Sequence, residues 1–247
     1  MKWRIIEYTQ NNASMNMAID EAVCESVLDG QRPTIRFYGW RPSAISIGYF
    51  QSLEKEVDLK KCKEMGVEFV RRRTGGGAVY HDAEGEITYS IIAKEENFPK
   101  GIIDSYKLIC QSIIDSLSKI GINAQFKPIN DIIVNEKKIS GNAQTRRNGI
   151  LLQHGTILYK VDVEKMFSLL KVSDEKIKDK MISTVKERVT SVYEQKQISK
   201  DELYRALVFG FTQNKEIEFD SLTEKEIKRA QELSQIKYSK DEWNKEK

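Results

Sequence analysis

Strand-like segments fill most of the first two thirds of the sequence, and helix-like segments fill most of the last third. A regular alternation of strands and helices would favour a doubly wound parallel sheet, whereas this clustering favours an α+β domain. The strand-like segments are short and are joined by turn signals such as Asn135 and Asn148-Gly149, where positive φ angles are accepted. We therefore predict an α+β fold in which mixed or antiparallel sheets pack against helices.

Amphipathic patterns predict the main helices. Apolar residues recur every three or four positions in residues 14–30 and 104–121, and each stretch ends on a glycine that is a helix stop signal. The sequence TEKE, residues 223–226, has the capping-box pattern and predicts the start of the final helix.

Length, charge and cysteine usage limit the class of protein. The 247 residues suit a single domain spanning 1–247, and 40 basic against 37 acidic residues give no overall basis for a nucleic-acid or membrane partner. The sequence contains neither a signal peptide nor a membrane-spanning apolar run, so we expect a cytoplasmic protein. Cys24, Cys62 and Cys110 have no metal-binding spacing and are expected to be reduced.

A glycine-rich stretch, RRRTGGGAVYHD at residues 71–82, is the strongest local signal. It has neither the P-loop pattern nor the glycine spacing of a dinucleotide site. A tight turn between two strands would explain the glycines, and at least one of the arginines is expected at a solvated edge. The functional interpretation is that bare backbone N–H groups and arginines receive an anionic ligand.

Two later stretches carry polar groups that suit the same ligand. In NDIIVNEKKISGNAQ, Asp131 precedes Lys138, and a small Ser140-Gly141 turn follows the lysine; in QHGTILY, His154 interrupts an apolar strand. Taken alone, a hairpin lysine is more often solvated and a histidine in an apolar strand is more often a satisfied core residue. The three stretches gain weight because they occur together.

Taken in order, these stretches resemble the superfamily of lipoate-protein ligases and octanoyltransferases, whose catalytic fold is shared with biotin protein ligases. The resemblance continues through IRFYGWRPSAISIGYFQ, through STVKERVTSV at 183–192 and through YSKDEWN at 238–244, so it covers almost the whole chain. It implies the α+β catalytic domain of that superfamily.

The resemblance also implies roles for individual residues. Arg72 matches an arginine that contacts the nucleotide, and Lys138 matches the catalytic lysine between the phosphate and the activated carboxyl group. Asp131 matches a position near the phosphates and is a candidate magnesium ligand. The implied ATP and lipoyl-AMP site further includes Gly75, Gly76, Gly77, Ala78, Val79, Tyr80, Ser140, Gly141, His154 and Gly155.

The implied reaction is ATP-dependent activation of lipoate to lipoyl-AMP, with Mg²⁺, followed by transfer to a lysine of a lipoyl domain. The acceptors would be the E2 subunits of 2-oxoacid dehydrogenases and the H protein of glycine cleavage. In ligases with a fused C-terminal accessory domain, the segment resembling DEWN lies near the end of the large domain. The resemblance therefore implies that the fused accessory domain is absent and that a separate small accessory protein supplies its function.

Two other functions are weighed against the ligase. Octanoyltransferases of this superfamily use a cysteine shortly before the segment matching NDIIV, and NAQFKPINDIIV contains none, which favours the ligase. A nucleic-acid-binding module would pair the arginines with exposed aromatic rings, but Tyr80 and Tyr89 lie on strands that look half-buried. The residues leave open whether lipoate or octanoate is preferred.

Overall fold

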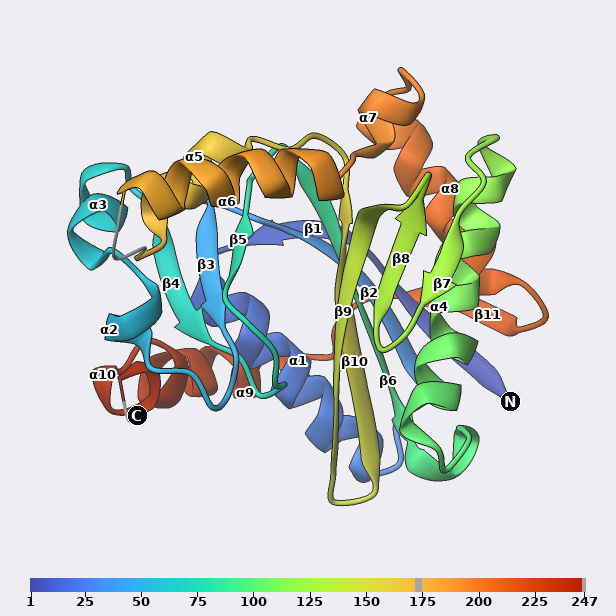
Figure 1. Ribbon diagram of the computed structural model, residues 1–247. Helices are drawn as coiled ribbons and strands as arrows, with labels where there is room; N and C mark the ends of the chain where they lie inside the picture. The colour runs from blue at the N-terminus through green and yellow to red at the C-terminus, as the bar shows by residue number, and fades with distance from the viewer. Residues whose placement is uncertain (172–174, 246–247) are drawn as a thin grey trace.

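The computed structural model describes residues 1–171 and 175–245, and shows two sheets surrounded by helices (Figure 1). The larger sheet has eight strands in the order β11-β1-β2-β6-β10-β9-β8-β7. Strand β1 pairs in parallel with β11 and with β2, and the remaining pairs are antiparallel. The strands are β1 (Lys2–Asn11), β2 (Thr34–Trp40), β6 (Glu86–Lys94), β7 (Gln125–Lys127), β8 (Asp131–Val134), β9 (Lys137–Arg147), β10 (Ile150–Leu158) and β11 (Glu216–Asp220).

The smaller sheet has three strands in the order β4-β3-β5. Its strands are β3 (Ala44–Ile47), β4 (Glu68–Arg71) and β5 (Val79–His81), with β3 parallel to β4 and antiparallel to β5. The glycine-rich stretch joins β4 to β5, so it crosses this sheet at one end. The mixed and antiparallel sheets confirm the predicted α+β class.

Several helices begin at side-chain caps that the sequence supplies. Asn12 accepts a hydrogen bond from the backbone of Met15, and both Ser199 and Thr223 form capping boxes. The helical segments are α1 (Ala13–Leu28), α2 (Leu53–Glu56), α3 (Leu59–Glu64), η1 (Glu95–Asn97), α4 (Ile102–Lys119), α5 (Val163–Leu169), α6 (Glu175–Arg188), α7 (Val192–Gln195), α8 (Lys200–Thr212), α9 (Glu224–Leu233), η2 (Ser234–Tyr238) and α10 (Asp241–Asn244).

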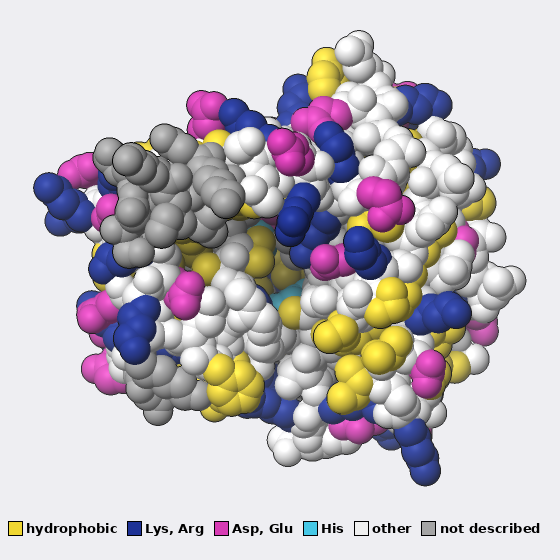
Figure 2. Space-filling model, viewed as in Figure 1, with side chains coloured by type: hydrophobic (Ala, Val, Ile, Leu, Met, Phe, Trp, Pro, Cys, Tyr) yellow, Lys and Arg dark blue, Asp and Glu magenta, His cyan; other side chains and the backbone are white. Residues whose placement is uncertain are grey.

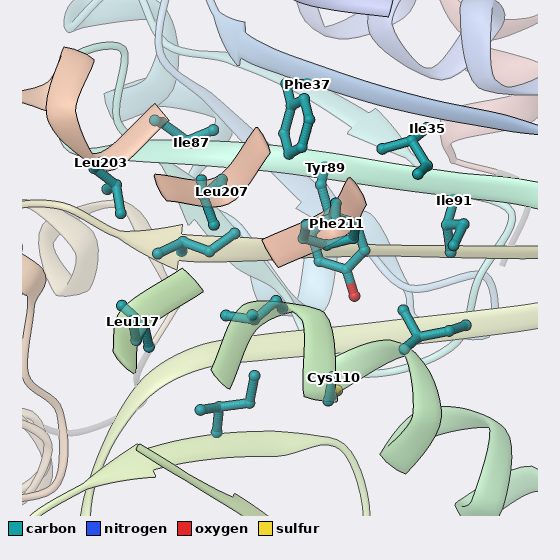
Figure 3. Close-up of a cluster of buried hydrophobic side chains, with 14 of the residues drawn as sticks. Ile35, Phe37, Ile87, Tyr89, Ile91, Cys110, Leu117, Leu203, Leu207 and Phe211 are labelled. Carbon is teal, nitrogen blue, oxygen red and sulfur yellow. The ribbon is translucent and has the colours of Figure 1, made fainter. Parts of the chain in front are cut away.

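Helices cover both faces of the large sheet. On one face α4 and α8 pack against the sheet, and Figure 3 shows Leu117, Leu207 and Phe211 from these helices against Ile87 and Tyr89 of β6. On the other face α1 lies against β6, β10 and β2 and is itself covered by α9. Helix α6 extends from the small sheet to β9 across the top of Figure 1.

The structure agrees with most predicted elements and corrects two. Positive φ angles occur at both predicted turns, near Asn135 and at Asn148-Gly149. The capping box at Thr223 opens α9, but η2 and α10 follow it, so α9 is not the final helix. Strand β11 was not expected, because it is only five residues long, four of these residues are exposed, and its strand conformation depends on parallel pairing with β1.

None of the helices in the described part of the chain combines the length and the apolar run that crossing a membrane requires.

Candidate functional site

A cavity of about 350 Å³ opens between the two sheets, beneath α5 and α6. Figure 2 shows the hollow on this face, with a histidine side chain visible in its depth. Among the residues singled out from the sequence, those that line the cavity are Arg72, Gly76, Gly77, Ala78, Val79, Tyr80, Lys138, Gly141, His154 and Gly155. The structure thus brings the three sequence stretches together around one cavity.

Arg72 holds the glycine loop, residues 74–77, from inside the protein. Its side chain is 5% exposed, and Nη2 donates to the carbonyl oxygens of Gly75 and Gly77, both at 2.8 Å. Nη1 donates to Ser46 O at 2.9 Å, and Nε donates to Thr74 Oγ1 at 3.1 Å. Burial lowers the pKa of Arg72 to about 10, so the guanidinium is still charged at neutral pH. The shape of the loop therefore depends on this side chain.

The glycines in and beside the loop differ in whether a side chain could replace the hydrogen on their Cα atom. Gly76 has φ +98°, a conformation that L side chains rarely adopt, and a Cβ there would lie 2.9 Å from Arg72 Nη2. A Cβ on Gly77 would meet no atom within 4 Å, since this residue faces the cavity. A Cβ on Gly48, in the loop after β3, would overlap the carbonyl oxygen of Gly76. Glycine is thus required at positions 48 and 76 by the protein itself.

His154 supports the loop from the large sheet. Its Nε2 lies 2.7 Å from Thr74 Oγ1, and its Nδ1 lies 3.3 Å from Asp20 Oδ2. Burial lowers the pKa of His154, which is therefore neutral, with Nδ1–H donating to Asp20 and Nε2 accepting from Thr74. Although burial alone would raise the pKa of Asp20, the hydrogen bond from His154 and the charge of Arg36 lower it. The carboxylate is consequently ionised and paired with Arg36 at 2.9 Å.

Lys138 provides a cation on the opposite wall. Its Nζ lies 2.7 Å from Asp131 Oδ1, and the two side chains are 40% and 32% exposed. Gly141 makes room for this lysine, because a Cβ there would lie 2.8 Å from both Cε and Nζ of Lys138. The Lys-to-Gly spacing in the sequence therefore has a packing reason.

Three of the predicted site residues do not line the cavity. The side chain of Asp131 contacts Lys138 instead, and Gly75 contributes a carbonyl oxygen to Arg72. Ser140 is fully buried, and its hydroxyl has no hydrogen-bond partner among the described residues. The pairing of β8 with β9 shifts register next to this serine, which interrupts the alternation of side chains between the two faces.

The expectation that one of the three arginines is a solvated edge residue was wrong. Arg71 and Arg72 are buried, and the side chain of Arg73 is 15% exposed and lies 3.8 Å from Glu21. Tyr80 and Tyr89, which a nucleic-acid site would need as exposed stacking surfaces, are 8% and 0% exposed.

Several cavity residues were not singled out from the sequence. The ring of His81 stacks on Trp40 at 4.0 Å between centroids, and its Nδ1 lies 2.7 Å from Glu86 Oε1. Asn142 accepts a hydrogen bond from the hydroxyl of Tyr89 at 2.8 Å. His81, Trp40 and Asn142 all belong to the sequence stretches quoted above. The stretches therefore predicted the region of the site, but they did not identify these three residues as part of it.

The described residues contain no group of three or more His, Cys, Asp or Glu side chains arranged to hold a metal ion. One carboxylate oxygen of Asp131 forms an ion pair with Lys138, and the side chain is half-exposed. A magnesium ion carried by a nucleotide needs only one or two protein carboxylates, because phosphate oxygens and waters complete its shell. Asp131 therefore fits a nucleotide-borne ion and does not form a dedicated metal site.

The three thiols lie outside the cavity lining. Cys24, Cys62 and Cys110 are buried, and burial raises the pKa of Cys62 to about 11 and that of Cys110 to about 12. Burial raises the pKa of Cys24 as well. At neutral pH these side chains are protonated and unreactive.

Comparison with known proteins gives a consistent family match. Residues 12–212 match the family described as the lipoyl protein ligase A/B catalytic domain. Octanoyltransferase LipM of Brevibacillus brevis is 35% identical over 98% of this chain and 98% of that protein. Lipoate-protein ligase A subunit 1 of Thermoplasma acidophilum is 38% identical over 96% of this chain and 93% of that protein.

Solved structures agree with the sequence relatives. A bi-partite lipoate protein ligase from Thermoplasma acidophilum superposes with a TM-score of 0.91 at 38% identity, covering 99% of this chain and 96% of that one. A lipoate-protein ligase A bound with ATP superposes with a TM-score of 0.84 at 35% identity, covering 99% and 98%.

Proposed function

The chain belongs to the lipoyl protein ligase A/B catalytic domain family, and from that premise we propose that it is a lipoate-protein ligase. It would join lipoate to AMP and then transfer the lipoyl group to a lysine of a lipoyl-domain protein. The observation that carries this proposal is the chemistry of the cavity wall. Glycine backbone and the cation of Lys138 face the cavity, and none of the described lining residues is a cysteine.

The absence of a thiol from the described cavity lining separates two routes of acyl transfer. A route through an acyl-enzyme needs a nucleophilic side chain whose thiolate or alkoxide is accessible. Each of the three cysteines is buried, with a raised pKa. A route through an acyl adenylate needs no such nucleophile, and its demand is for positive charge and for space beside the backbone.

The first step would place two anions together. The lipoate carboxylate attacks the α-phosphorus of ATP, a C–O–P bond forms, and the bond to the β-phosphate breaks with release of pyrophosphate. Lys138 is the residue best placed to offset the charge that develops, because its ammonium is half-exposed at the cavity wall. Mg²⁺ bound to the phosphates would supply further positive charge, with Asp131 as its candidate protein ligand.

The second step would form an amide. The ε-amine of the acceptor lysine attacks the acyl carbon, AMP leaves, and the amine loses a proton to the solvent or the phosphate. The cover of the cavity would exclude water from the reactive anhydride. Met166 of α5, Val185 of α6 and Val189, which follows α6, contribute apolar side chains to this cover.

Octanoyl transfer from an acyl carrier protein is a second candidate, and the relatives' names favour it over the ligase. The octanoyltransferase name is carried by LipM of Brevibacillus brevis and by further relatives at 36% identity. The loop before β8, residues 128–130, is Pro-Ile-Asn and contains no thiol. Octanoyl transfer by this chain would therefore need a nucleophile other than a cysteine of that loop.

The deciding experiment measures lipoate-dependent exchange of labelled pyrophosphate into ATP, with and without added cell extract, beside octanoyl transfer from octanoyl acyl carrier protein to a lipoyl domain. The ligase predicts exchange, and it predicts no covalent octanoyl adduct on the chain by intact mass spectrometry. An octanoyl adduct without exchange would establish the transferase instead.

We also propose that the chain, as one catalytic domain, works with a separate accessory polypeptide. The support is the likeness to a lipoate protein ligase from Thermoplasma acidophilum that is described as bi-partite, and to a relative from the same organism that is named lipoate-protein ligase A subunit 1. Exchange should then be low with the purified chain and should rise when cell extract is added, while transfer from preformed lipoyl-AMP should not change. Rapid exchange by the purified chain alone would contradict this part of the proposal.

A further inference from the structure

The outer edge of strand β4 is covered by side chains of the turn α10. Strand β4 lies at the edge of the small sheet, where backbone groups would otherwise lack partners. The N–H of Arg71 donates to Asn244 Oδ1 at 2.7 Å, and the carbonyl oxygen of Arg71 accepts from Trp243 Nε1 at 2.9 Å. Two side chains of α10 thus replace a neighbouring strand at this one residue.

The guanidinium of Arg71 extends the connection to a second loop. Its Nε donates to Trp243 O and its Nη2 donates to Asn244 O, both at 2.8 Å. Its Nη1 donates to Tyr49 O at 2.9 Å and to Gln51 O at 2.6 Å. Since this arginine is 1% exposed, its bonds hold α10 and the loop of residues 48–51 together from inside the protein.

The loop of residues 48–51 in turn supports the glycine loop. The N–H of Tyr49 donates to Thr74 O at 2.8 Å, and Gly48 lies so close to Gly76 O that no Cβ would fit. Arg72, the next residue after Arg71, grips the glycine loop from its other side. A continuous set of contacts therefore runs from Trp243 and Asn244 to the backbone that lines the cavity.

We propose that Trp243 and Asn244 are positioning residues for acyl-adenylate binding, acting through Arg71 on the glycine loop. The inference rests on the proposed function, because it assigns the glycine loop to an acyl adenylate. Neither residue is among the described residues that line the cavity, so both act at a distance from the ligand. Loss of either contact loosens the glycine loop and weakens binding of the adenylate.

Asn244 offers a matched pair of variants that isolates one contact. Its Oδ1 accepts from Arg71, while its Nδ2 donates to Tyr238 O and Lys240 O. Asn244→Asp and Asn244→Leu both lose the Nδ2 donors, and the aspartate alone keeps an oxygen for the N–H of Arg71. Calorimetry with a non-hydrolysable lipoyl-sulfamoyl adenosine should show about 10-fold weaker binding for Asn244→Leu than for Asn244→Asp, the scale of one buried, unpaired donor.

Trp243→Phe provides a second variant, in which the ring is kept and the Nε1–H donor is lost. Trp3→Phe is its control, since Trp3 is buried on β1 in the core beside α4 and α8, away from the glycine loop. Trp243→Phe should bind the analogue about 3- to 10-fold more weakly than Trp3→Phe, as expected for one hydrogen bond. A purely structural role would instead lower the melting temperature with unchanged affinity.

The outcomes separate the two proposals. Wild-type protein that does not bind the analogue overturns the proposed function and this inference with it. This inference alone is overturned if the wild-type protein binds the analogue but the variants show no difference. That is the case when Asn244→Leu binds as tightly as Asn244→Asp, and Trp243→Phe as tightly as Trp3→Phe. Weaker binding confined to Asn244→Leu and Trp243→Phe supports it.

Discussion

The two walls of the cavity are built in opposite ways. In the glycine wall, residues 71–80, Arg72 is 5% exposed and donates from each guanidinium nitrogen to oxygen atoms of the protein. In the lysine wall, residues 130–142, the side chain of Lys138 is 40% exposed and contacts one carboxylate oxygen of Asp131. One wall is fixed by buried hydrogen bonds, and the other presents a charge on a flexible stem.

This difference assigns a separate task to each wall. Moving Arg72 would unpair the buried carbonyl oxygen of Ser46, which costs about 1–3 kcal/mol, and would leave the buried guanidinium without acceptors, so the glycine wall keeps its shape without a ligand. A half-exposed ion pair is worth only about 0–1 kcal/mol, so Lys138 can exchange Asp131 for a phosphate at small cost. In the proposed reaction the glycine wall provides shape and the lysine wall provides charge.

The largest expected effect comes from removing that charge. Lys138→Ala should lower the rate of lipoyl-AMP formation by on the order of 10²-fold or more, because a preorganised cation at the reacting phosphate is lost. The melting temperature should change little, since the side chain is half-exposed and its ion pair is weak. Pyrophosphate exchange and thermal unfolding measure the two quantities.

Lys137→Ala is the matched control for this variant. Lys137 is the preceding residue of β9, is also partly exposed, and is not among the described residues that line the cavity. It should retain nearly full exchange activity. Equal exchange activities of the two variants would contradict a role for Lys138 in lipoyl-AMP formation.

Substitutions at two glycines of the glycine wall should have different effects, one on the affinity for lipoyl-AMP and the other on the free energy of unfolding. Gly77→Val places its side chain into the open cavity and should weaken binding of lipoyl-AMP by about 10-fold or more, the equivalent of roughly 1.4 kcal/mol, with little change in unfolding. Gly76→Ala should destabilise the fold by about 1–2 kcal/mol, because φ is +98° and Arg72 is in the way. Calorimetry and urea unfolding distinguish these results.

Gly66→Ala controls for backbone strain alone. Gly66 has φ +63°, and a Cβ there would meet no atom within 4 Å. It should cost about 1 kcal/mol in stability and leave lipoyl-AMP binding intact. Unchanged binding by Gly77→Val would mean that the open space beside that glycine does not receive the ligand.

The sequence predicted the parts of each wall whose residue types are rare in ordinary strands. Consecutive glycines and a lysine followed by small residues are unusual in a buried sheet, and the resemblance then put them in one site. The predicted turn at Ser140-Gly141 was wrong, because both residues lie within β9 and pair with neighbouring strands. Ser140 stays a prediction. It is buried outside the described cavity lining, next to a register shift in the β8–β9 pair that changes which face a residue takes, and nothing local signals that shift.

Long-range partners were beyond the reach of sequence patterns. Arg71 was predicted to bind a ligand or solvent, yet its partner Asn244 lies 173 residues away and α10 covers the edge of β4. The stacking of His81 on Trp40 joins β5 of the small sheet to β2 of the large one. Such pairs exist only after the two sheets have assembled, so propensity and periodicity carry no information about them.

A pH experiment tests how firmly the glycine wall is supported. Burial lowers the pKa of His154 in the folded protein, whereas in the unfolded chain the imidazole titrates near 6.5. Below that pH the unfolded state binds more protons, so stability falls on acidification, by at most about 1.4 kcal/mol for each pH unit from this group. The pKa of Asp20 is also lowered, and its contribution is lost only below its ordinary pKa of 3.8.

His154→Gln should therefore lose less stability than the wild type between pH 7.5 and pH 5.5, a difference of about 1 kcal/mol in urea unfolding. Thr74→Val removes the hydroxyl that meets Nε2 but keeps the imidazole, so it should retain the acid sensitivity of the wild type. Parallel pH profiles for the wild type and His154→Gln would show that the histidine is not held neutral.

The smallest effect on activity is expected for the cysteines, which belong to neither wall. A variant with Cys24, Cys62 and Cys110 all replaced by Ala should form lipoyl-AMP at close to the wild-type rate, since adenylation uses no thiolate. Stability should fall by roughly 1 kcal/mol at each position, because all three thiols are buried and their removal leaves small cavities. Exchange assays below the melting temperature of the variant separate the two effects. Loss of activity in the folded variant, together with an octanoyl adduct on one wild-type cysteine, would mean that a thiol and not Lys138 carries the acyl chemistry.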